Sequence, residues 1–533
     1  MTKDVRSSLL FGILITLAVR GYRFGESNHA VYLVDALRQL DPTLLRNDWW
    51  ANSTLQYHFV FNAMTAGLMR AGLLEPAFLV GYLLLAALLH VAWRGLVVRL
   101  GGSNGTYFLS VVLFYVLAGG VGLGMYHFLQ DSAFLPSNIA NVAMLWGLYF
   151  WISGAPASAG VCLGIAGLFH INHALAGIGL WAGATFLEGR RLPGRSWWVG
   201  TLALLALGAV QIVPAVRVVL PRSGKLPTDE FVDLFVRLRH PHHFGPSTWH
   251  WGIWLAFLAP IAPAIVAARS PAAMQSEPRI VEARRRAAAM FKLFLAMTCV
   301  ALLTAGFWFA GETFVQLNLY RFSIYPKLLS CVAVAWLVWD VHARARPYAV
   351  AAIVLVGAAA GLVAASSGLL AAPTPRSPLG LKLVGLQGDD AGYLDLARWA
   401  RDNTSTDAVF LVPPDEESFR VHARRAIVVN FKGVPQLSAE LPAWRDRLCD
   451  VLDLDTAGLL ALPRPLGRTL RAIRERYDRV PAEHHFATAR KYGARYVVLT
   501  RRASAPGAAR EVRADSQFGY YVYDLPAEGE AVR

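Results

Sequence analysis

Charged residues are scarce in this sequence. Only 16% of the 533 residues are Asp, Glu, Lys or Arg, 55% are hydrophobic, and the mean hydropathy is +0.40. Soluble domains carry about 25% charged residues. Several apolar runs reach the roughly 20 residues that cross the hydrocarbon core of a bilayer. The composition therefore excludes an ordinary soluble protein and predicts an integral membrane protein.

Cysteine is also rare, and the motifs that would give it chemistry are missing. Cys162, Cys299 and Cys331 lie in apolar stretches, and Cys449 stands alone in a hydrophilic region. No CxxC pair or Cys/His zinc spacing occurs, so we interpret these residues as small buried hydrophobic side chains. The sequence also lacks the GxGxxG and GxxxxGK motifs, so nucleotide binding is not supported.

Positive charge exceeds negative charge, with a formal net charge of +15 and a pI near 9.8. In a soluble protein this excess would suggest nucleic acid as a partner. Here the arginines cluster between apolar stretches, as expected of the cytoplasmic loops of a membrane protein. We therefore expect membrane lipids, and no nucleic acid, as partners.

The apolar stretches predict a polytopic α-helical protein with about 11 transmembrane helices. One of them, residues 174–187, is short and is expected to be a broken or tilted helix, packed inside the protein or lining a cavity. The predicted spans are 7–22, 76–97, 106–122, 137–153, 157–170, 174–187, 196–215, 249–268, 287–309, 323–340 and 347–369.

The charge pattern predicts the orientation of these spans. Lys3 and Arg6 precede the first span, and no small-residue cleavage site follows it, so we expect an uncleaved helix with a cytoplasmic N-terminus. Alternation then places the short arginine-rich loops in the cytoplasm. These loops contain Arg190, Arg191 and Arg195; Arg269, Arg279, Arg284, Arg285 and Arg286; and Arg344 and Arg346. The expected location is the cytoplasmic (inner) membrane of a bacterium.

Two domains are expected. Residues 1–370 form a transmembrane domain with a long first outer loop, residues 21–75, in which Thr54–Leu73 is a helix lying in the membrane interface. A proline-rich linker follows, and residues 376–533 form a soluble extracytoplasmic α/β domain. Its predicted helices are Tyr393–Asp402 and His485–Tyr492, and its predicted strands, mostly parallel, are Ala408–Val412, Ala426–Val429, Arg495–Leu499 and Tyr520–Tyr523.

The first outer loop carries most of the candidate chemistry. Glu26 and Asp48 stand near membrane exits, where a carboxylate could serve as a general base or a metal ligand. Asn28 follows Glu26, and His29 and Asp35 lie on one face of a predicted helix. The alternative for this loop is a solvated amphipathic helix with capping aspartates.

The later outer loops add polar side chains at the ends of spans. His127 and Asp131 are four residues apart, His170 and His173 flank an asparagine, and His242 and His243 follow a proline. Their irregular spacing gives only weak support for zinc, and a divalent metal stays an open alternative. Glu312 and Arg321 border another span, and the arginine fork matches phosphate oxygens. Loop ordering, water-exposed span ends and snorkelling to headgroups are the competing explanations.

The arrangement resembles the type C glycosyltransferase superfamily, polytopic enzymes that use polyprenyl-phosphate-linked sugars. The features that carry the resemblance are the long first outer loop from Glu26 to Asp48, the interface helix and the C-terminal outer domain. The loop has no Asp-x-Asp or Asp-Glu pair such as some members show. Three segments, LARWARDNTSTDAVFLVPP (Leu396–Pro414), FRVHARRAIVVNFKGVP (Phe419–Pro435) and RHPHHFGPSTW (Arg239–Trp249), look like an uncharacterised family of bacterial multi-pass membrane proteins.

The superfamily resemblance implies transfer of a sugar from a lipid-linked donor to an acceptor at the outer surface of the membrane. Arg321 would hold the donor phosphate, and Glu26, or second Asp48, would take the acceptor's proton. The remaining candidates would bind substrate: Asn28, His29, Asp35, His127, Asp131, His170, His173, His242, His243 and Glu312. The alternatives are a transporter or flippase for a lipid-linked or polar solute, and a non-catalytic envelope assembly protein.

Overall fold

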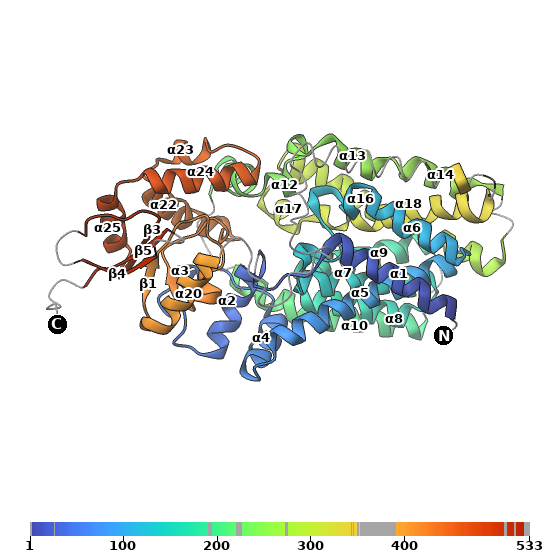
Figure 1. Cartoon of the computed structure of the whole chain (residues 1–533). Coiled ribbons are helices and arrows are strands. Elements are labelled where there is room, and N and C mark those ends of the chain that lie inside the picture. The colour runs from blue at the N-terminus through green and yellow to red at the C-terminus, as the bar shows by residue number, and fades with distance from the viewer. Residues whose placement is uncertain are drawn as a thin grey trace. The chain divides into compact units, whose positions relative to one another are not determined.

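The computed structural model divides the chain into two compact units (Figure 1). It describes residues 3–25, 27–189, 194–219, 226–271, 276–342, 344, 346–348, 351, 391–505, 509–515 and 519–526. Unit 1 comprises Met1–Arg23, Pro76–Ala215 and His243–Leu383. Unit 2 comprises Phe24–Glu75, Val216–His242 and Val384–Arg533.

Unit 1 is a bundle of helices (Figure 1). Its larger helices are α1 (Lys3–Arg20), α5 (Leu74–Arg99), α6 (Asn104–Val116), α7 (Pro136–Ile152), α8 (Pro156–Phe169), α9 (Ile171–Glu188), α10 (Arg195–Val219), α13 (Trp251–Leu258), α14 (Ile261–Arg269), α16 (Pro278–Ala301) and α18 (Ile324–Trp336). Short helical turns precede or extend several of them: η6 (Leu302–Phe307), α17 (Glu312–Leu317), η7 (Leu319–Ser323) and η8 (Leu337–Val341).

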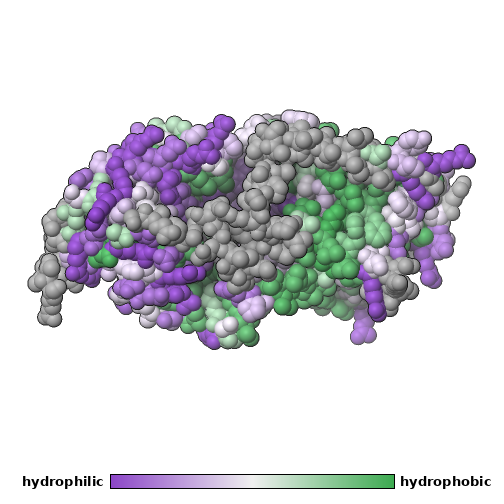
Figure 2. Space-filling model, in the orientation of Figure 1, coloured by the Kyte–Doolittle hydropathy of each residue, from purple (hydrophilic) through white to green (hydrophobic). Residues whose placement is uncertain are grey.

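Five helices of the described chain are long and apolar enough to cross a membrane. They are Leu74–Arg99, Arg195–Arg217, Trp251–Arg269, Pro278–Phe307 and Glu312–Val341. Large apolar side chains project outward from several of them, among them Leu84, Leu202 and Val266, each more than half exposed. Figure 2 shows a broad hydrophobic face over this bundle. Helices apolar all round their circumference need lipid on the side that packs against no protein.

Small residues allow the helices of the bundle to approach closely. A Cβ added to Gly160 of α8 would lie 2.2 Å from the carbonyl oxygen of Gly200 in α10, and one added to Gly164 would lie 2.8 Å from the oxygen of Ala203. Backbones in such contact gain the van der Waals packing that drives helix association in lipid. The GxxxG spacing of Gly160 and Gly164 therefore fixes the interface between α8 and α10.

Ten of the expected spans contain helix, and the eleventh, 347–369, lies almost wholly outside the described residues. The segment 174–187, expected to be broken or tilted, is part of the continuous 18-residue helix α9. The His170 imidazole caps its first turn by accepting from the Asn172 N–H at 3.3 Å. The expected span was short because the polar residues Asn172 and His173 start the helix, which begins three residues before the expected boundary.

Unit 2 is an α/β unit. Its helices include α2 (His29–Leu40), α3 (Trp49–Ser53), α4 (Phe59–Arg70), α11 (Thr228–Phe231), η4 (Val232–Arg239), α20 (Ala391–Asn403), α21 (Phe419–His422), α22 (Leu441–Leu452), α23 (Thr456–Leu460), α24 (Leu466–Arg479) and α25 (Ala482–Lys491). Figure 2 shows a largely hydrophilic surface over the C-terminal elements of this unit.

A five-stranded sheet lies within unit 2, in the order β2-β1-β3-β5-β4. Its strands are β1 (Val409–Leu411), β2 (Ala426–Ile427), β3 (Tyr496–Leu499), β4 (Arg510–Asp515) and β5 (Tyr520–Asp524). Pairs β1–β2 and β1–β3 are parallel, whereas β3–β5 and β4–β5 are antiparallel. The four expected strands are present; β4, at the sheet edge and largely polar, was not expected.

The division into units differs from the expected domain boundaries. Residues Phe24–Glu75, expected to be an outer loop of the transmembrane domain, belong with the C-terminal residues in unit 2. The expected interface helix Thr54–Leu73 is α4, which packs against α2 of the same unit. Trp49 Nε1 donates to the Val428 carbonyl at 2.5 Å, so the first loop is part of the packing of unit 2. The proposed linker 373–378 lies outside the described residues.

Candidate functional site

The loop between α6 and α7 of unit 1, residues 117–135, has an unusual backbone. Four of its non-glycine residues, Ala118, Met125, Asp131 and Ser132, have φ between 52° and 62°. This left-handed region costs an L-residue about 1 kcal/mol or more. Such strain persists only where the surrounding structure enforces it, and it concentrates at functional sites.

Neighbouring helices hold this loop in place. Lys327 of α18 donates from Nζ to the carbonyls of Leu117 and Val121, both at 2.6 Å. Asn141 of α7 donates to the carbonyls of His127 and Phe128 at 3.0 and 3.2 Å. Buried irregular backbone at the end of a helical bundle needs such partners for its polar groups.

Three cations surround the loop: Arg20, Arg321 and Lys327. Arg20 donates from Nη1 to His127 Nε2 at 2.9 Å and from Nη2 to the Gly119 carbonyl. Lys327 is fully buried. Within the described residues, none of the three has a carboxylate within 4 Å. A cation in such a position is costly without a counter-charge, so this cluster favours an anionic ligand.

Arg321 lies on an aromatic stack. Its guanidinium is 4.9 Å from the centre of the Tyr126 ring, and the His243 ring stacks on Tyr126 at 4.7 Å with an interplanar angle of 11°. Asn318 donates to the Tyr126 hydroxyl. Arg321 Nε and Asn318 Oδ1 are buried without a hydrogen-bond partner in the described chain. Unsatisfied groups of this kind are expected where a ligand binds.

His127 is held as a neutral imidazole. Burial lowers its pKa well below the usual range, and the charges of Arg20 and Lys327 lower the pKa further. Because an arginine can only donate, His127 Nε2 accepts, and the proton of the neutral ring is on Nδ1. His127 thus orients Arg20 without adding charge.

The histidines at the start of α9 connect to the same loop. His173 Nε2 lies 2.8 Å from Asn141 Oδ1, and the rings of His170 and His173 are 4.9 Å apart. Glu312 accepts from Gln316 Nε2 at 2.6 Å, and the Gln316 carbonyl accepts from Asn172 at 3.0 Å. The structure therefore gathers seven of the sequence-predicted residues in unit 1: His127, Asp131, His170, His173, His243, Glu312 and Arg321. We call the group formed by Arg20, Tyr126, His127, Asp131, His243, Asn318, Arg321 and Lys327 the 117–135 site.

Asp48 lies in unit 2, in a fully buried ion pair. Its Oδ2 accepts from Arg420 Nε at 2.7 Å and from the Ile427 N–H at 3.0 Å, and its Oδ1 accepts from the Ala51 N–H at 2.9 Å. Asp48 is 0% exposed and Arg420 is 2% exposed. All these partners are protein groups, so this geometry serves the packing of α3 against α21 and β2.

The other first-loop candidates also belong to unit 2. His29 Nδ1 accepts from the Gly25 N–H at 3.0 Å, and Asp35 accepts from Asn62 at 2.9 Å, which ties α2 to α4. Asn28 precedes α2. His242, a candidate from a later outer loop, also belongs to unit 2, and its ring is 6.1 Å from that of His240. Glu26 lies outside the described residues.

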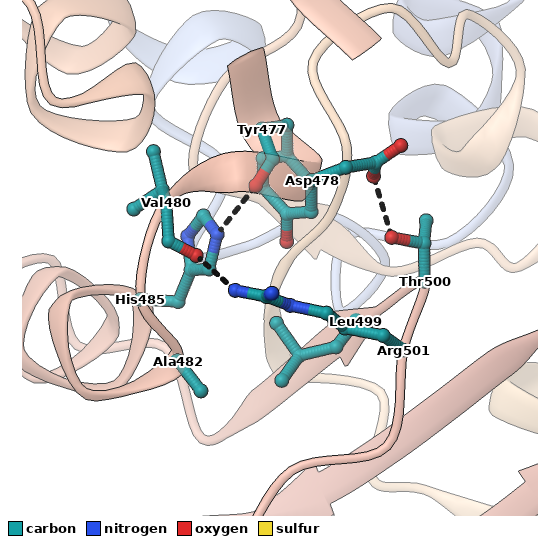
Figure 3. Close-up of a pocket in the computed structure, with 8 residues that line it drawn as sticks. All are labelled: Tyr477, Asp478, Val480, Ala482, His485, Leu499, Thr500 and Arg501. Atoms are coloured by element: carbon teal, nitrogen blue, oxygen red, sulfur yellow. Dashed lines mark hydrogen bonds between the residues drawn. The ribbon is translucent and has the colours of Figure 1, made fainter. Parts of the chain in front are cut away.

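A small surface pocket in unit 2 lies among α24, α25 and β3 (Figure 3). Arg501 donates to the Val480 carbonyl at 3.0 Å, and Thr500 donates to Asp478. His485 Nε2 lies 3.1 Å from the Tyr477 carbonyl. The pocket has room for about one water molecule, which is too little for a sugar or a phosphate.

No group of three or more His, Cys, Asp or Glu side chains in the described residues could hold a metal ion. Sequence reasoning missed Arg20 and Lys327, the cations that make the 117–135 site electropositive. Both fall within predicted spans, at 7–22 and 323–340. A charged residue inside a span is a functional candidate, and that signal could have found them.

Comparison with protein families finds a match within unit 2. Residues 391–451 match a family described as a domain of unknown function, DUF6798. The match covers α20 to α22 of unit 2, including Arg420, the partner of Asp48. The description of the family names no activity. No curated protein matches the sequence significantly.

Proposed function

We propose that this protein is a membrane glycosyltransferase that moves a sugar from a polyprenyl-phosphate-linked donor to an acceptor. The observation that carries the proposal is the group of three cations, Arg20, Arg321 and Lys327, without a carboxylate partner in the described part of unit 1. The phosphate of a polyprenyl lipid supplies the missing negative charge. The polyprenyl tail lies in the bilayer, which the apolar face of the bundle also contacts.

The proposal includes the topology. About eleven spans start from a cytoplasmic N-terminus in the inner membrane of a bacterium, and unit 2 lies outside the cytoplasm. The 117–135 loop follows the third predicted span and is then on the outer side, where the polyprenyl-linked sugar would be presented. The positive-inside distribution of the arginines supports this orientation.

Arg321 is the residue that we assign to the donor phosphate. Its guanidinium is fixed over Tyr126 and keeps its buried Nε unpartnered, so a phosphate oxygen finds a preorganised donor there. Arg20 and Lys327 donate hydrogen bonds to carbonyls of the loop, so they act on the phosphate through their positive charge and not by direct contact. The leaving polyprenyl phosphate gains negative charge as the sugar departs, and this positive surround stabilises it.

The test is sugar transfer by the full-length protein in proteoliposomes, with a panel of polyprenyl-phosphate sugars. We expect Arg321→Ala to raise the donor KM at least tenfold and Arg321→Lys to recover part of the loss, because lysine keeps the charge but not the fork. The matched control is Arg346→Ala, since Arg346 also lies over an aromatic ring, 5.1 Å from Trp339, outside the site. Equal effects at both arginines, or no product from the wild type, would contradict the proposal.

A second candidate function, transport of a lipid-linked or polar solute, is favoured by one buried polar chain. His90 of α5 lies 2.7 Å from the Thr16 hydroxyl and 2.9 Å from the Tyr107 hydroxyl, and Thr16 lies 2.7 Å from Tyr115. Polar groups inside a bundle mark transport pathways in many membrane proteins. Solute flux without a glycosyl product, lost in His90→Phe, would favour this function.

A further inference from the structure

We propose that Asp131 is the base that takes the acceptor's proton at the 117–135 site. The inference rests on the proposed glycosyl transfer and deepens it by assigning a role that the first-loop carboxylates were expected to fill. The evidence is the state of the carboxylate, its backbone and its neighbours.

The Asp131 carboxylate can accept further hydrogen bonds or a proton. Its Oδ1 is 3.4 Å from Gln130 Nε2, a long contact, and its Oδ2 is buried without a hydrogen-bond partner in the described chain. No described cation lies within 4 Å of it. Asp48 differs, because three protein donors already use its two oxygens. A base must keep a lone pair for the proton it accepts, and Asp131 does so.

The backbone around Asp131 holds its carboxylate in one position. Asp131 has φ 54° and ψ 15°, and Ser132 beside it is also left-handed. Ser132 donates to the Arg20 carbonyl, its own carbonyl accepts from the Arg23 N–H at 2.7 Å, and the Gln130 N–H donates to Asn138 at 2.7 Å. Contacts on both sides therefore hold the strained residue in one position.

Asp131 and the phosphate-binding arginine act on the same aromatic ring. Burial raises the pKa of the Tyr126 phenol; the positive charge of Arg321, which lies over the ring, lowers this pKa, and the negative charge of Asp131 raises it. A displacement needs both a base and a cation for the leaving group, and Asp131 and Arg321 carry these two charges within the 117–135 site. The acceptor and the leaving phosphate must occupy opposite sides of the anomeric carbon.

The chemical step is a single displacement. The acceptor hydroxyl oxygen forms a bond to the anomeric carbon, and the bond from that carbon to the phosphate oxygen breaks with its electron pair going to the phosphate. The hydroxyl proton passes to Asp131 Oδ2 and from there to water. The products are the glycoside, polyprenyl phosphate and that proton, and the anomeric configuration is inverted.

The test compares Asp131→Asn with Asp453→Asn in the transfer assay. Asp453 also has a left-handed backbone, φ 49°, but lies at the end of α22 in unit 2 and is exposed, so the same substitution there is a matched control. Asparagine tolerates this conformation, so both variants should fold. We expect Asp131→Asn to lower kcat about 100-fold or more while the donor KM changes less than threefold, Asp131→Glu to recover part of the rate, and Asp453→Asn to match the wild type.

The outcomes separate this inference from the function it rests on. Wild-type kcat in Asp131→Asn, a loss of donor binding equal to that of Arg321→Ala, or a product with retained anomeric configuration would each overturn the assignment of Asp131 and leave glycosyl transfer standing. Absence of any product from the wild type would overturn both.

Discussion

At the scale of single residues, burial distinguishes Asp48, which is fully buried, from Asp35 and Asp131, which are partly exposed. Glu26, Asp35, Asp48 and Asp131 all lie in predicted outer loops, and the pattern of residues ranked Glu26 first and Asp48 second as a base. The structure pairs Asp48 with Arg420, which is 372 positions away. Such a partner cannot be read from local spacing, because it depends on the fold of the whole of unit 2.

We therefore expect Asp48→Ala to unfold unit 2 rather than to act on chemistry alone. Removing one partner of a buried ion pair leaves the other charge uncompensated and costs about 3–5 kcal/mol. Thermal unfolding of the full-length protein in detergent measures the loss. The control is Asp446→Ala, an exposed aspartate inside helix α22, which should change the free energy of unfolding by less than about 0.5 kcal/mol. A stable Asp48→Ala protein without transfer activity would instead make Asp48 catalytic.

His485 gives unit 2 a pH dependence. Burial lowers the pKa of this histidine to about 4 from an ordinary value near 6.5. The unfolded chain therefore binds a proton that the folded chain excludes, so stability is complete above pH 6.5 and falls as the pH drops toward 4, by about 3 kcal/mol in all.

Hydrogen exchange of residues 477–501 in the full-length protein, corrected for intrinsic rates, follows this change. We expect protection to fall between pH 6.5 and 4.5 in the wild type, and this fall to shrink in His485→Gln. The same pH slope in both proteins would exclude His485 as its source.

At the scale of elements, helices were predictable and their irregular connections were not. Apolar runs located α5, α10 and α16 because a spanning helix needs a long uniform composition. The predicted span 106–122 instead stops as α6 at Val116, where the 117–135 loop begins. Residues 117–122 are apolar, with 117–119 partly buried and 120–122 buried, and hydropathy cannot tell such a loop from a helix.

Substitution of two glycines tests the geometry of the 117–135 loop. Gly120 has φ 78°, and an added Cβ would lie 2.8 Å from the Phe114 ring, whereas Gly179 in helix α9 has nothing within 4 Å. We expect Gly120→Ala to lower the melting temperature and to reduce transfer, because it adds strain and a clash. Gly179→Ala should stabilise the protein by about 0.5–1 kcal/mol, since alanine favours helix. Similar effects of the two substitutions would contradict the described loop.

At the scale of the whole molecule, the sequence separates long apolar stretches from polar ones but does not show which loops belong together. Hydropathy assigned residues 21–75 to the membrane domain because they lie between spans. Packing assigns Phe24–Glu75 to unit 2, through long-range contacts such as that of Leu55 N–H with Glu440 at 3.0 Å. Only tertiary structure carries this information.

The topology can be tested by cysteine labelling in intact cells, in a background without the four native cysteines. Ser27 and Ser418 both lie in unit 2, so Ser27→Cys and Ser418→Cys should react with an impermeant reagent from outside the cytoplasm. Ser196→Cys, beside the arginines at the start of α10, should react only after the membrane is opened. Ser27 and Ser418 on opposite sides of the membrane would contradict both the orientation and the division into units.

The most direct test of the central claim, that the 117–135 site binds a lipid phosphate, is photocrosslinking with a diazirine-bearing polyprenyl phosphate. The probe is added to the full-length protein in nanodiscs, and labelled peptides are mapped by mass spectrometry. The account predicts label within residues 117–135 and 318–327, lost in Arg321→Ala and kept in Arg346→Ala. Label spread over the lipid-facing helices to the same extent in all three proteins would contradict it.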